Sequence, residues 1–533
     1  MFRRLVAPVA LLAVVLSPAA GQPRLVSPAP RPTLVVFVTV DQMRSDYFQR
    51  FDKQLTGGFR RLFDGGAFFL DAYQDHGITE TAPGHASTMS GRFPVHTGIV
   101  MNSQGVNGVP DAELIDAQPN EPSASPIRFQ GTTLTDWIRA AEPQMRFLSV
   151  SRKDRGAILP IGKSKGNVYW WSANGTFTTS RYYADSLPTW VKRFNARKMA
   201  QSYAGKEWTL LLPESAYPEP DSVPIESGGI DYLFPHQVPS DSGIAARVAA
   251  GFPWMDDITL AFALAGLQQL GLGSATNRTD VLNISLSTTD AIGHRFGPDS
   301  RELHDQIVRL DRALGVFFDS LFKLRDQQSV VVALTGDHGM APFPTLKSTI
   351  YPNHDAKLVS LSAPWTAFLD RLTAAGVDRT AVDMEEAAVV VTKPDAFAKA
   401  GVNADSAIAS FGADAKRVEG VQRADLMTTL ANADTVHDAI ARRWLHMFRP
   451  DGPVRLIVTL TPYSYWSGVT FATHGSPHDY DAKVPVVFYG SRVRAGRYSE
   501  FVRVVDMAPT LAEIVGVKPL EAIDGHVLRQ ALR

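Results

Sequence analysis

The sequence predicts an α/β protein in which a central, mostly parallel sheet is flanked by helices on both faces. Two observations lead to this fold class. Short, continuous runs of β-branched and other apolar residues recur along the chain, which is typical of strands buried on both faces. Amphipathic helical patterns lie between these runs, and strands that alternate with helices form parallel sheets. The length of 533 residues allows one large domain with insertions.

Five apolar runs are the predicted strands. The clearest is LVVFVTV at residues 34–40, and the others are Val281–Leu286, Val330–Leu334, Val454–Leu460 and Val484–Tyr489. Because proline cannot donate a ladder hydrogen bond, Pro485 predicts that the last strand begins at Val486. The clearest helix is Glu302–Lys323, where Leu, Ile and Phe recur at spacings of three and four residues.

Two segments look like insertions that could cap the active face of the sheet. Residues 160–250 are rich in Trp, Tyr, Pro and Ser and show poor periodicity. Residues 345–462 carry helical patterns of their own, at Trp365–Ala375 and Asp434–His446. We therefore expect residues 22–533 to form one domain with cap insertions at about 160–250 and 345–462.

The first 21 residues have the features of a secretory signal peptide. Arg3 and Arg4 precede the apolar run Leu5–Leu16, and small residues follow at 19–21. A run of about 12 apolar residues is shorter than the ~20 that span a bilayer, and no later stretch is long enough. We therefore expect an exported protein, periplasmic or secreted, with no membrane span in its mature chain.

The composition excludes several classes of function. The formal net charge is −1, from 53 basic and 54 acidic side chains, so no basic excess favours nucleic-acid binding. There is no cysteine, which excludes disulfides, thiolate zinc sites and cysteine nucleophiles.

Six carboxylate and imidazole side chains adjoin the predicted strands. Five follow a strand and the last precedes one: Asp41, Asp290, His294, Asp337, His338 and His474. Ligands bind at the carboxyl ends of strands in open α/β sheets, so the first five should converge on one rim. These side chains suit zinc or another divalent first-row metal. Six ligands exceed the needs of one tetrahedral catalytic zinc, so they predict a two-metal site of the kind that acts on phosphate esters.

A candidate nucleophile lies in the segment TETAPGH at residues 79–85, which precedes a small-residue helical stretch at 86–91. A hydroxyl at a helix N-terminus can be deprotonated near a metal and used for covalent catalysis. On the residues alone, N-capping by Thr79 or Thr81 is the simpler interpretation.

These residues resemble the alkaline phosphatase superfamily. The matching motifs are VDQMRSD, TETAPGHASTMSGRFPVHTGIVMN, STTDAIGH, TGDHGM, THGSPHDYDAKVPVVFYG and VVDMAPTLAEIVG, spread from residue 40 to residue 516. The resemblance implies an alkaline-phosphatase-like fold with two divalent metal ions, expected to be Zn²⁺.

The resemblance also implies a role for each residue. Thr81 matches the nucleophile, and its oxygen joins Asp41, Asp337 and His338 at the metal that activates it. The second metal, which stabilises the leaving group, would be held by Asp290, His294 and His474. His478 is a rival for His474, which is preferred because His-Gly is the matching pair.

Three polar residues indicate the branch within the superfamily. Asn102 lies 21 residues after Thr81 and matches the asparagine that contacts a phosphate oxygen. Lys153 and Arg155 resemble the Lys-x-Arg pair of bacterial alkaline phosphatases with a threonine nucleophile, and they would share one face if the strand-like run at 147–155 continued. A solvated charged loop is the alternative. Phosphodiesterase relatives lack this pair, so it favours small phosphate monoesters as substrates.

Other functions fit these residues less well. A sulfatase needs a formylglycine made from Cys or Ser, and position 81 is Thr. Cofactor-independent phosphoglycerate mutases and phosphopentomutases are typically intracellular, which the signal peptide opposes. A binding protein that had lost catalysis would be expected to lack a ligand or the threonine, and all are present. A phosphodiesterase or nucleotide pyrophosphatase of the same superfamily is the main alternative.

Overall fold

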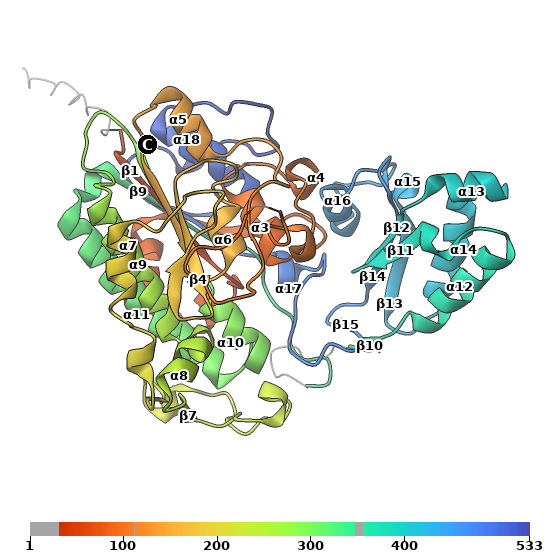
Figure 1. Ribbon diagram of the computed structural model, residues 1–533, viewed down its shortest axis with the longest axis horizontal. Coiled ribbons are helices and arrows are strands. Elements are labelled where there is room, and N and C mark those ends of the chain that lie inside the picture. The colour runs from red at the N-terminus through yellow and green to blue at the C-terminus, as the bar shows by residue number, and fades with distance from the viewer. Residues whose placement is uncertain (1–30, 111, 347–354) are drawn as a thin grey trace, which may run out of the picture.

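The structure is a computed structural model that describes residues 31–110, 112–346 and 355–533. The predicted signal peptide at residues 1–21 lies outside the described residues. A larger body holds the central sheet, and a smaller lobe with a sheet of its own lies beside it (Figure 1).

The central sheet has nine strands and is mostly parallel, as predicted. Its strands are, in order across the sheet, β17 (Gly496–Arg503), β2 (Ala67–Tyr73), β16 (Val486–Gly490), β9 (Val330–Gly336), β1 (Leu34–Val40), β8 (Asp280–Leu286), β3 (Phe147–Ser151), β4 (Asn167–Ser172) and β5 (Thr176–Thr178). The strands β16 and β5 run antiparallel to their neighbours. Every residue of β1 is buried, because β8 and β9 pair with both of its edges and helices cover both faces.

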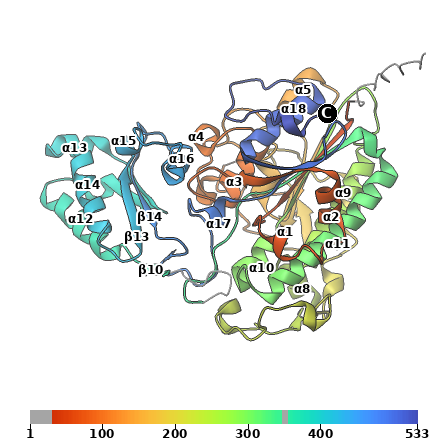
Figure 2. The same cartoon turned by 180° about the vertical axis from the view of Figure 1, so that it is seen from behind.

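Helices cover the two faces of the sheet, which explains the continuous apolar runs. Alternate residues of β1 enter two different cores, with Val36 and Val38 on one face and Val35 and Phe37 on the other. The first face packs against α2 (Gly58–Gly65), α9 (Trp254–Gln269) and α11 (Arg301–Leu324), and the second against α3 (Thr81–Thr88), α5 (Leu134–Ala141), α6 (Asp154–Ile158) and α18 (Met507–Val515). Figure 2 shows the two groups of helices on opposite sides of the sheet.

The small lobe is built on a four-stranded antiparallel sheet. Its strands are β11 (Val382–Glu385), β12 (Ala388–Val391), β14 (Val454–Leu460) and β13 (Val421–Leu426), with α12 (Ser362–Ala374), α13 (Pro394–Ala400), α14 (Ala404–Ala415), α15 (Met427–Leu430) and α16 (Ala439–Leu445). The strand predicted at Val454–Leu460 is confirmed as β14, but it belongs to the sheet of the lobe and not to the central sheet. Apart from Arg455 and Thr459, this run is apolar, because Leu456 and Val458 pack in the core of the lobe while Val454 and Ile457 pack in a second core toward the body.

The segment 160–250, which the sequence predicts to be an insertion, is partly integrated into the central sheet, because β4 and β5 extend the edge of that sheet. The remaining α-helices and strands of the chain are short, apart from α10: α1 (Tyr47–Arg50), α4 (Pro94–Thr97), α7 (Thr189–Asn195), α8 (Ser242–Val248), α10 (Thr288–Phe296), α17 (Asp479–Ala482), β6 (Glu207–Trp208), β7 (His236–Gln237), β10 (Leu358–Val359) and β15 (Tyr465–Trp466).

Across the described residues, no single helix is long and apolar enough to cross a membrane. Two consecutive helices, at 242–251 and 254–269, reach this length and apolar character only when they are taken together, and the chain bends by 91° between them.

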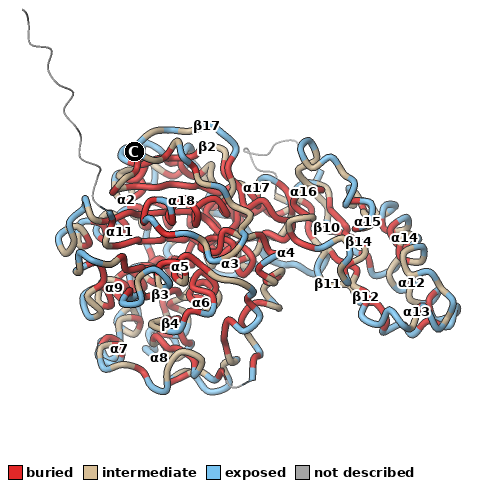
Figure 3. The backbone as a smooth tube through the Cα atoms, turned by 90° about the horizontal axis from the view of Figure 1, so that it is seen from above, coloured by how far each residue is buried: buried red, intermediate tan, exposed pale blue. Residues whose placement is uncertain are grey.

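A buried carboxylate joins the lobe to the body. Asp75, in the loop after β2, is fully buried and contacts the guanidinium groups of Arg442 at 2.9 Å and Arg503 at 3.0 Å. Arg442 belongs to α16 of the lobe and Arg503 to β17 of the body. Figure 3 shows that α12 and α13 at the far end of the lobe are largely exposed. The side of the lobe that carries α16 therefore packs against the rim of the sheet.

Candidate active site

The carboxyl ends of three neighbouring parallel strands bring the predicted carboxylates together. Asp41 directly follows β1, Asp290 lies in the first turn of α10 after β8, and Asp337 directly follows β9. Because β9, β1 and β8 are adjacent and parallel, their carboxyl ends meet at one rim. His474 precedes its strand, but β16 is antiparallel to β9, so the start of β16 lies at this same rim.

The six predicted metal ligands form two groups. In each, one ligand atom from each residue lies within 4.8 Å of the others, and the groups are Asp41, Asp337 and His338, and Asp290, His294 and His474. The imidazoles of His338 and His474 are stacked with ring centroids 3.6 Å apart, so the two groups adjoin. His478 is in neither group, and its Nε2 contacts the carbonyl of Leu460 at 2.9 Å instead.

Buried carboxylate oxygens in the first group fit a divalent cation. Asp41 and Asp337 are completely buried, and among the described residues neither oxygen of Asp41 nor Oδ2 of Asp337 has a hydrogen-bond partner. Ion contacts are present, with the Lys153 ammonium 2.7 Å from Asp41 Oδ2 and the His85 Nδ1 3.0 Å from Asp337 Oδ2. Ionised oxygens are costly to bury without strong partners, and carboxylates with imidazole are common ligands of divalent first-row metals.

The pKa values of two imidazoles report the charge of the site. Burial lowers the pKa of His338, but the carboxylates of Asp337 and Asp41 raise it by more, to about 9. Burial and the nearby His338 lower the pKa of His474 to about 3. The first shift requires a strongly negative local potential, which suits the binding of cations.

The hydroxyl of Thr81 lies at this rim and does not cap its helix. Thr81 is the first residue of α3, the N-cap is Glu80, and no side chain makes a capping hydrogen bond there. Thr79 does not cap the helix either, because its hydroxyl donates to the carbonyl of Ser476 at 2.8 Å. The Thr81 Oγ1 is instead 3.1 Å from the Lys153 ammonium and 3.4 Å from His338 Nε2.

Asn102 is oriented by two hydrogen bonds to the start of α3. Its Oδ1 accepts the backbone N–H of Ala82 at 2.9 Å, and its own backbone N–H donates to Glu80 Oε2 at 2.7 Å. The amide oxygen is thus used by the helix that carries Thr81, and the amide nitrogen is the group that can donate to a ligand.

Lys153 and Arg155 do not share a strand face, because the strand-like run at 147–155 does not continue as a strand beyond Ser151. The strand β3 ends at Ser151, whose hydroxyl accepts the N–H of Lys153, and the chain then turns into α6, which contains Arg155. The Lys153 ammonium contacts Asp290 Oδ2 at 2.6 Å as well as Thr81. The described ion pair of Arg155 is with Asp154, 3.7 Å away, and its buried Nε has no partner among the described residues.

Gln42 is a site residue that sequence reasoning missed. Its backbone N–H donates to Asp337 Oδ1 at 3.0 Å and its side-chain Nε2 donates to Asp290 Oδ1 at 3.2 Å, so it links the two ligand groups. Its φ of 66° is in the left-handed region, which is uncommon for residues other than glycine. A Cβ at Gly293 would lie 1.7 Å from Gln42 Oε1, so a larger residue there would displace the Gln42 side chain from its present position. Only the position of Gln42 next to Asp41 could have indicated this role.

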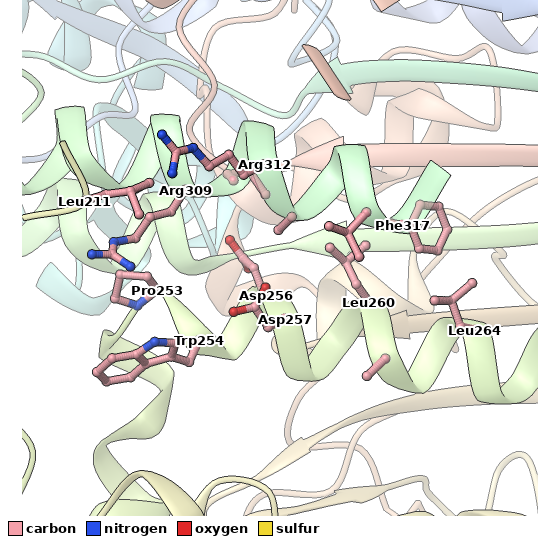
Figure 4. A pocket seen from close by; sticks show the side chains of 14 residues that line it. Leu211, Pro253, Trp254, Asp256, Asp257, Leu260, Leu264, Arg309, Arg312 and Phe317 are labelled. Atoms are coloured by element: carbon pink, nitrogen blue, oxygen red, sulfur yellow. The ribbon is translucent and has the colours of Figure 1, made fainter. Parts of the chain in front are cut away.

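Asp256 is a second missed residue, and it supports the helix that carries Asp290. It lies on α9 beside a groove of about 450 Å³ between α9 and α11 (Figure 4). Its Oδ1 accepts the hydroxyl of Thr288, the first residue of α10, at 2.7 Å, and its Oδ2 accepts the amide of Gln306 at 2.9 Å. Burial raises the pKa of Asp256 to about 7. Asp256 therefore holds α10 in place, but ionisation of this buried side chain lowers the stability of the folded protein.

Replacing Asp256 by Asn should change how stability depends on pH. Because the folded pKa of about 7 is above the ordinary aspartate pKa of 3.8, the folded wild type loses stability as pH rises from about 4 to 7. The Asp256→Asn variant lacks this loss, so its free energy of unfolding relative to wild type should rise by roughly 3 kcal/mol between pH 5 and pH 8. Urea unfolding at both pH values measures this, with the exposed Asp370→Asn as the control. A pH-independent difference would contradict the expectation.

Comparisons with known proteins assign the family. The family described as type I phosphodiesterase / nucleotide pyrophosphatase matches residues 35–432. The chain is 30% identical over 528 residues to alkaline phosphatase PhoV of Synechococcus elongatus, which covers 94% of this chain and 93% of the relative. It is 28% identical over 526 residues to alkaline phosphatase PhoK of Sphingomonas, with 93% and 91% covered.

A solved structure agrees with these relatives. The crystal structure of alkaline phosphatase PafA matches with a TM-score of 0.85 and 25% identity, over 95% of this chain and all of that one. The chain belongs to the type I phosphodiesterase / nucleotide pyrophosphatase family of hydrolases, in its bacterial alkaline phosphatase branch.

Proposed function

We propose that this alkaline phosphatase is exported and hydrolyses small phosphate monoesters through a covalent phosphothreonine at Thr81, with two zinc ions as cofactors. The observation that carries the proposal is the position of the Thr81 hydroxyl, which is 3.1 Å from the Lys153 ammonium and beside His338 of the first ligand group. The proposal of export, to the periplasm or the medium, rests on the sequence of residues 1–21.

The reaction has two displacements at phosphorus. The Thr81 Oγ attacks in line, the bond from phosphorus to the ester oxygen breaks, and the alcohol leaves while phosphothreonine forms. Water then attacks the phosphothreonine, the bond to Thr81 Oγ breaks, and inorganic phosphate leaves with overall retention of configuration. Two divalent cations, one held by Asp41, Asp337 and His338 and the other by Asp290, His294 and His474, would supply Lewis acidity that lowers hydroxyl pKa values and offsets charge on the departing oxygen.

Three side chains are proposed to bind the non-bridging phosphate oxygens. Lys153 supplies a positive charge directly at the Thr81 hydroxyl, and Asn102 supplies an amide donor fixed by its bond to Ala82. Arg155 carries a buried Nε with no partner among the described residues, which is a donor that a phosphate oxygen could use. Oriented donors of this kind stabilise the charge that develops in the transition state.

A phosphodiesterase or nucleotide pyrophosphatase activity is the alternative, because the matching family includes both. Lys153 favours the monoesterase. A monoester dianion presents more charge to this ammonium than a diester monoanion, in which a second ester group replaces one charged oxygen.

The test compares kcat/KM for p-nitrophenyl phosphate and bis-p-nitrophenyl phosphate, with and without a chelator. We expect a strong preference for the monoester, loss of activity with the chelator, and recovery when zinc is added after the chelator is removed. Magnesium added in place of zinc tests the identity of the metal. Preference for the diester would move the enzyme to the phosphodiesterase activity of its family, and full activity in the chelator would refute the metal requirement.

A further inference from the structure

A cavity of about 280 Å³ lies between the body and the lobe, and His474 is one of the residues that line it. On the body side it is lined by Glu80, which precedes Thr81, and by residues of the segment 473–481. On the lobe side it is lined by Glu386 and Ala387, in the turn between β11 and β12, and by residues of β14. In the proposed mechanism His474 belongs to the group that serves the departing oxygen, so this cavity is next to the place where the leaving group is released.

The walls of the cavity combine aromatic and acidic side chains. Trp444, Tyr465, Trp466 and Tyr480 supply aromatic surface. The charged residues are acidic, and none of the described residues that line the cavity is a lysine or an arginine: Glu80, Glu386 and Asp481. A cavity with this lining is complementary to a cation that also carries apolar surface, because aromatic faces and carboxylates both attract cations.

Asp481 gives independent support for a ligand with a donor group. It is 1% exposed, and its Oδ1 has no hydrogen-bond partner among the described residues. Its Oδ2 accepts the backbone N–H and the hydroxyl of Ser476 at 3.0 and 2.6 Å, which holds the carboxylate in place. A buried acceptor without a partner is costly, and a donor in the cavity would remove that cost.

Glu386 places a second carboxylate at the mouth of the cavity. It is exposed, and its φ of 51° is in the left-handed region, as required by the tight turn between β11 and β12. Burial and the nearby carboxylates of Glu80 and Glu385 raise its pKa. Glu80 belongs to the body, where its Oε2 accepts the backbone N–H of Asn102, so the cavity is lined by acidic groups of both the body and the lobe.

These carboxylates do not form a metal site. Among the described residues, the groups of three ligand atoms that lie within 4.8 Å of one another are the two groups of the reaction centre. The carboxylates of the cavity are therefore spread along its walls, as suits an extended organic cation better than a metal ion.

We propose that this cavity holds the leaving group of the substrate and selects phosphate monoesters whose alcohol carries a cationic amine on an aromatic or other apolar stem. This inference rests on the proposed function, because the position of the leaving group beside His474 follows from it. The apolar stem packs against Trp466, and the amine reaches the carboxylates of Glu386 and Asp481.

Three phenyl phosphates of similar shape test the inference. Their para substituents are aminoethyl, propyl and carboxyethyl, which are cationic, neutral and anionic while the phenol leaving groups remain similar. For the holoenzyme we expect kcat/KM to fall in that order, with about a tenfold difference between the cationic and anionic esters. The reason is that each carboxylate of the cavity attracts the cationic ester and repels the anionic one. The readout is the ratio of kcat/KM for the cationic ester to kcat/KM for the anionic ester, because a general loss of activity affects both values equally and cancels.

Two matched variants identify the residue that sets the ratio. Glu386→Gln should reduce the ratio to about twofold or less. Glu385→Gln makes the same change of charge one residue away, at a side chain that bonds Gln104 and does not line the cavity, and should leave the ratio unchanged. Equal rates for all three esters, or an unchanged ratio in Glu386→Gln, would overturn the inference while the phosphatase activity stands. Absence of turnover of every ester would instead overturn the proposed function.

Discussion

Replacing Thr81 by Ala is expected to lower kcat for p-nitrophenyl phosphate by about 10⁴-fold or more. The hydroxyl is the only atom of Thr81 that can attack phosphorus, and its loss removes the covalent pathway. The fold should persist, because Thr81 Oγ1 makes no capping bond to α3 and its contacts are with Lys153 and His338. The measurement is steady-state kcat, accompanied by metal content and the thermal unfolding midpoint.

Two controls separate the nucleophile from a structural role. Thr81→Ser keeps a hydroxyl at the same position and should retain much of the activity. Acid quenching during turnover, followed by mass spectrometry, should find phosphate on the peptide that contains Thr81 in the wild type and none in Thr81→Ala. Full activity of Thr81→Ala with normal metal content would show that the nucleophile is another residue.

Replacing Lys153 by Ala is expected to lower kcat/KM for the monoester by about 10²- to 10³-fold, and for the diester by less than about tenfold. The ammonium lies 3.1 Å from Thr81 Oγ1, where it can stabilise the charge of the transferring phosphoryl group. A monoester dianion depends more on this charge than a diester monoanion does. Both rates should be measured with zinc at saturation, because Lys153 also contacts Asp41 and Asp290.

Arg155→Ala is the matched comparison for Lys153→Ala. Its guanidinium pairs with Asp154 in the structure and has no described contact with Thr81, so the loss for the monoester should be smaller than that of Lys153→Ala. It should still exceed the loss for the diester, since the proposal assigns Arg155 to the phosphate. Equal losses for the two esters in both variants would refute the assignment of this pair to a monoester dianion.

Local patterns in the sequence predicted much of the central sheet. The run at residues 34–40 is strand β1 with the same bounds, and β16 begins at Val486, as Pro485 predicted. The helical periodicity at 302–323 corresponds to α11, at Arg301–Leu324. These elements were predictable because burial on both faces of a strand, or on one face of a helix, leaves a short-range pattern of apolar residues.

The same patterns do not encode the partner of a strand. The run at Val454–Leu460 has the composition of a central strand, but it forms β14 in the sheet of the lobe. It is apolar on both faces because two separate cores cover it. Local periodicity reports burial, whereas strand partners depend on contacts between residues far apart in the chain.

The sequence by itself determined the chemical types at the site: carboxylate and imidazole ligands at strand ends, a threonine before α3, and a lysine after β3. Only the tertiary structure decided how they meet. His474 reaches the rim because β16 runs antiparallel to β9, and Lys153 reaches Thr81 because the chain turns into a helix after Ser151. The roles of Gln42 and Asp256 likewise depend on partners between 32 and 295 residues away. Residue identity is local, whereas strand direction, turns and distant hydrogen bonds are set by the packing of the whole chain.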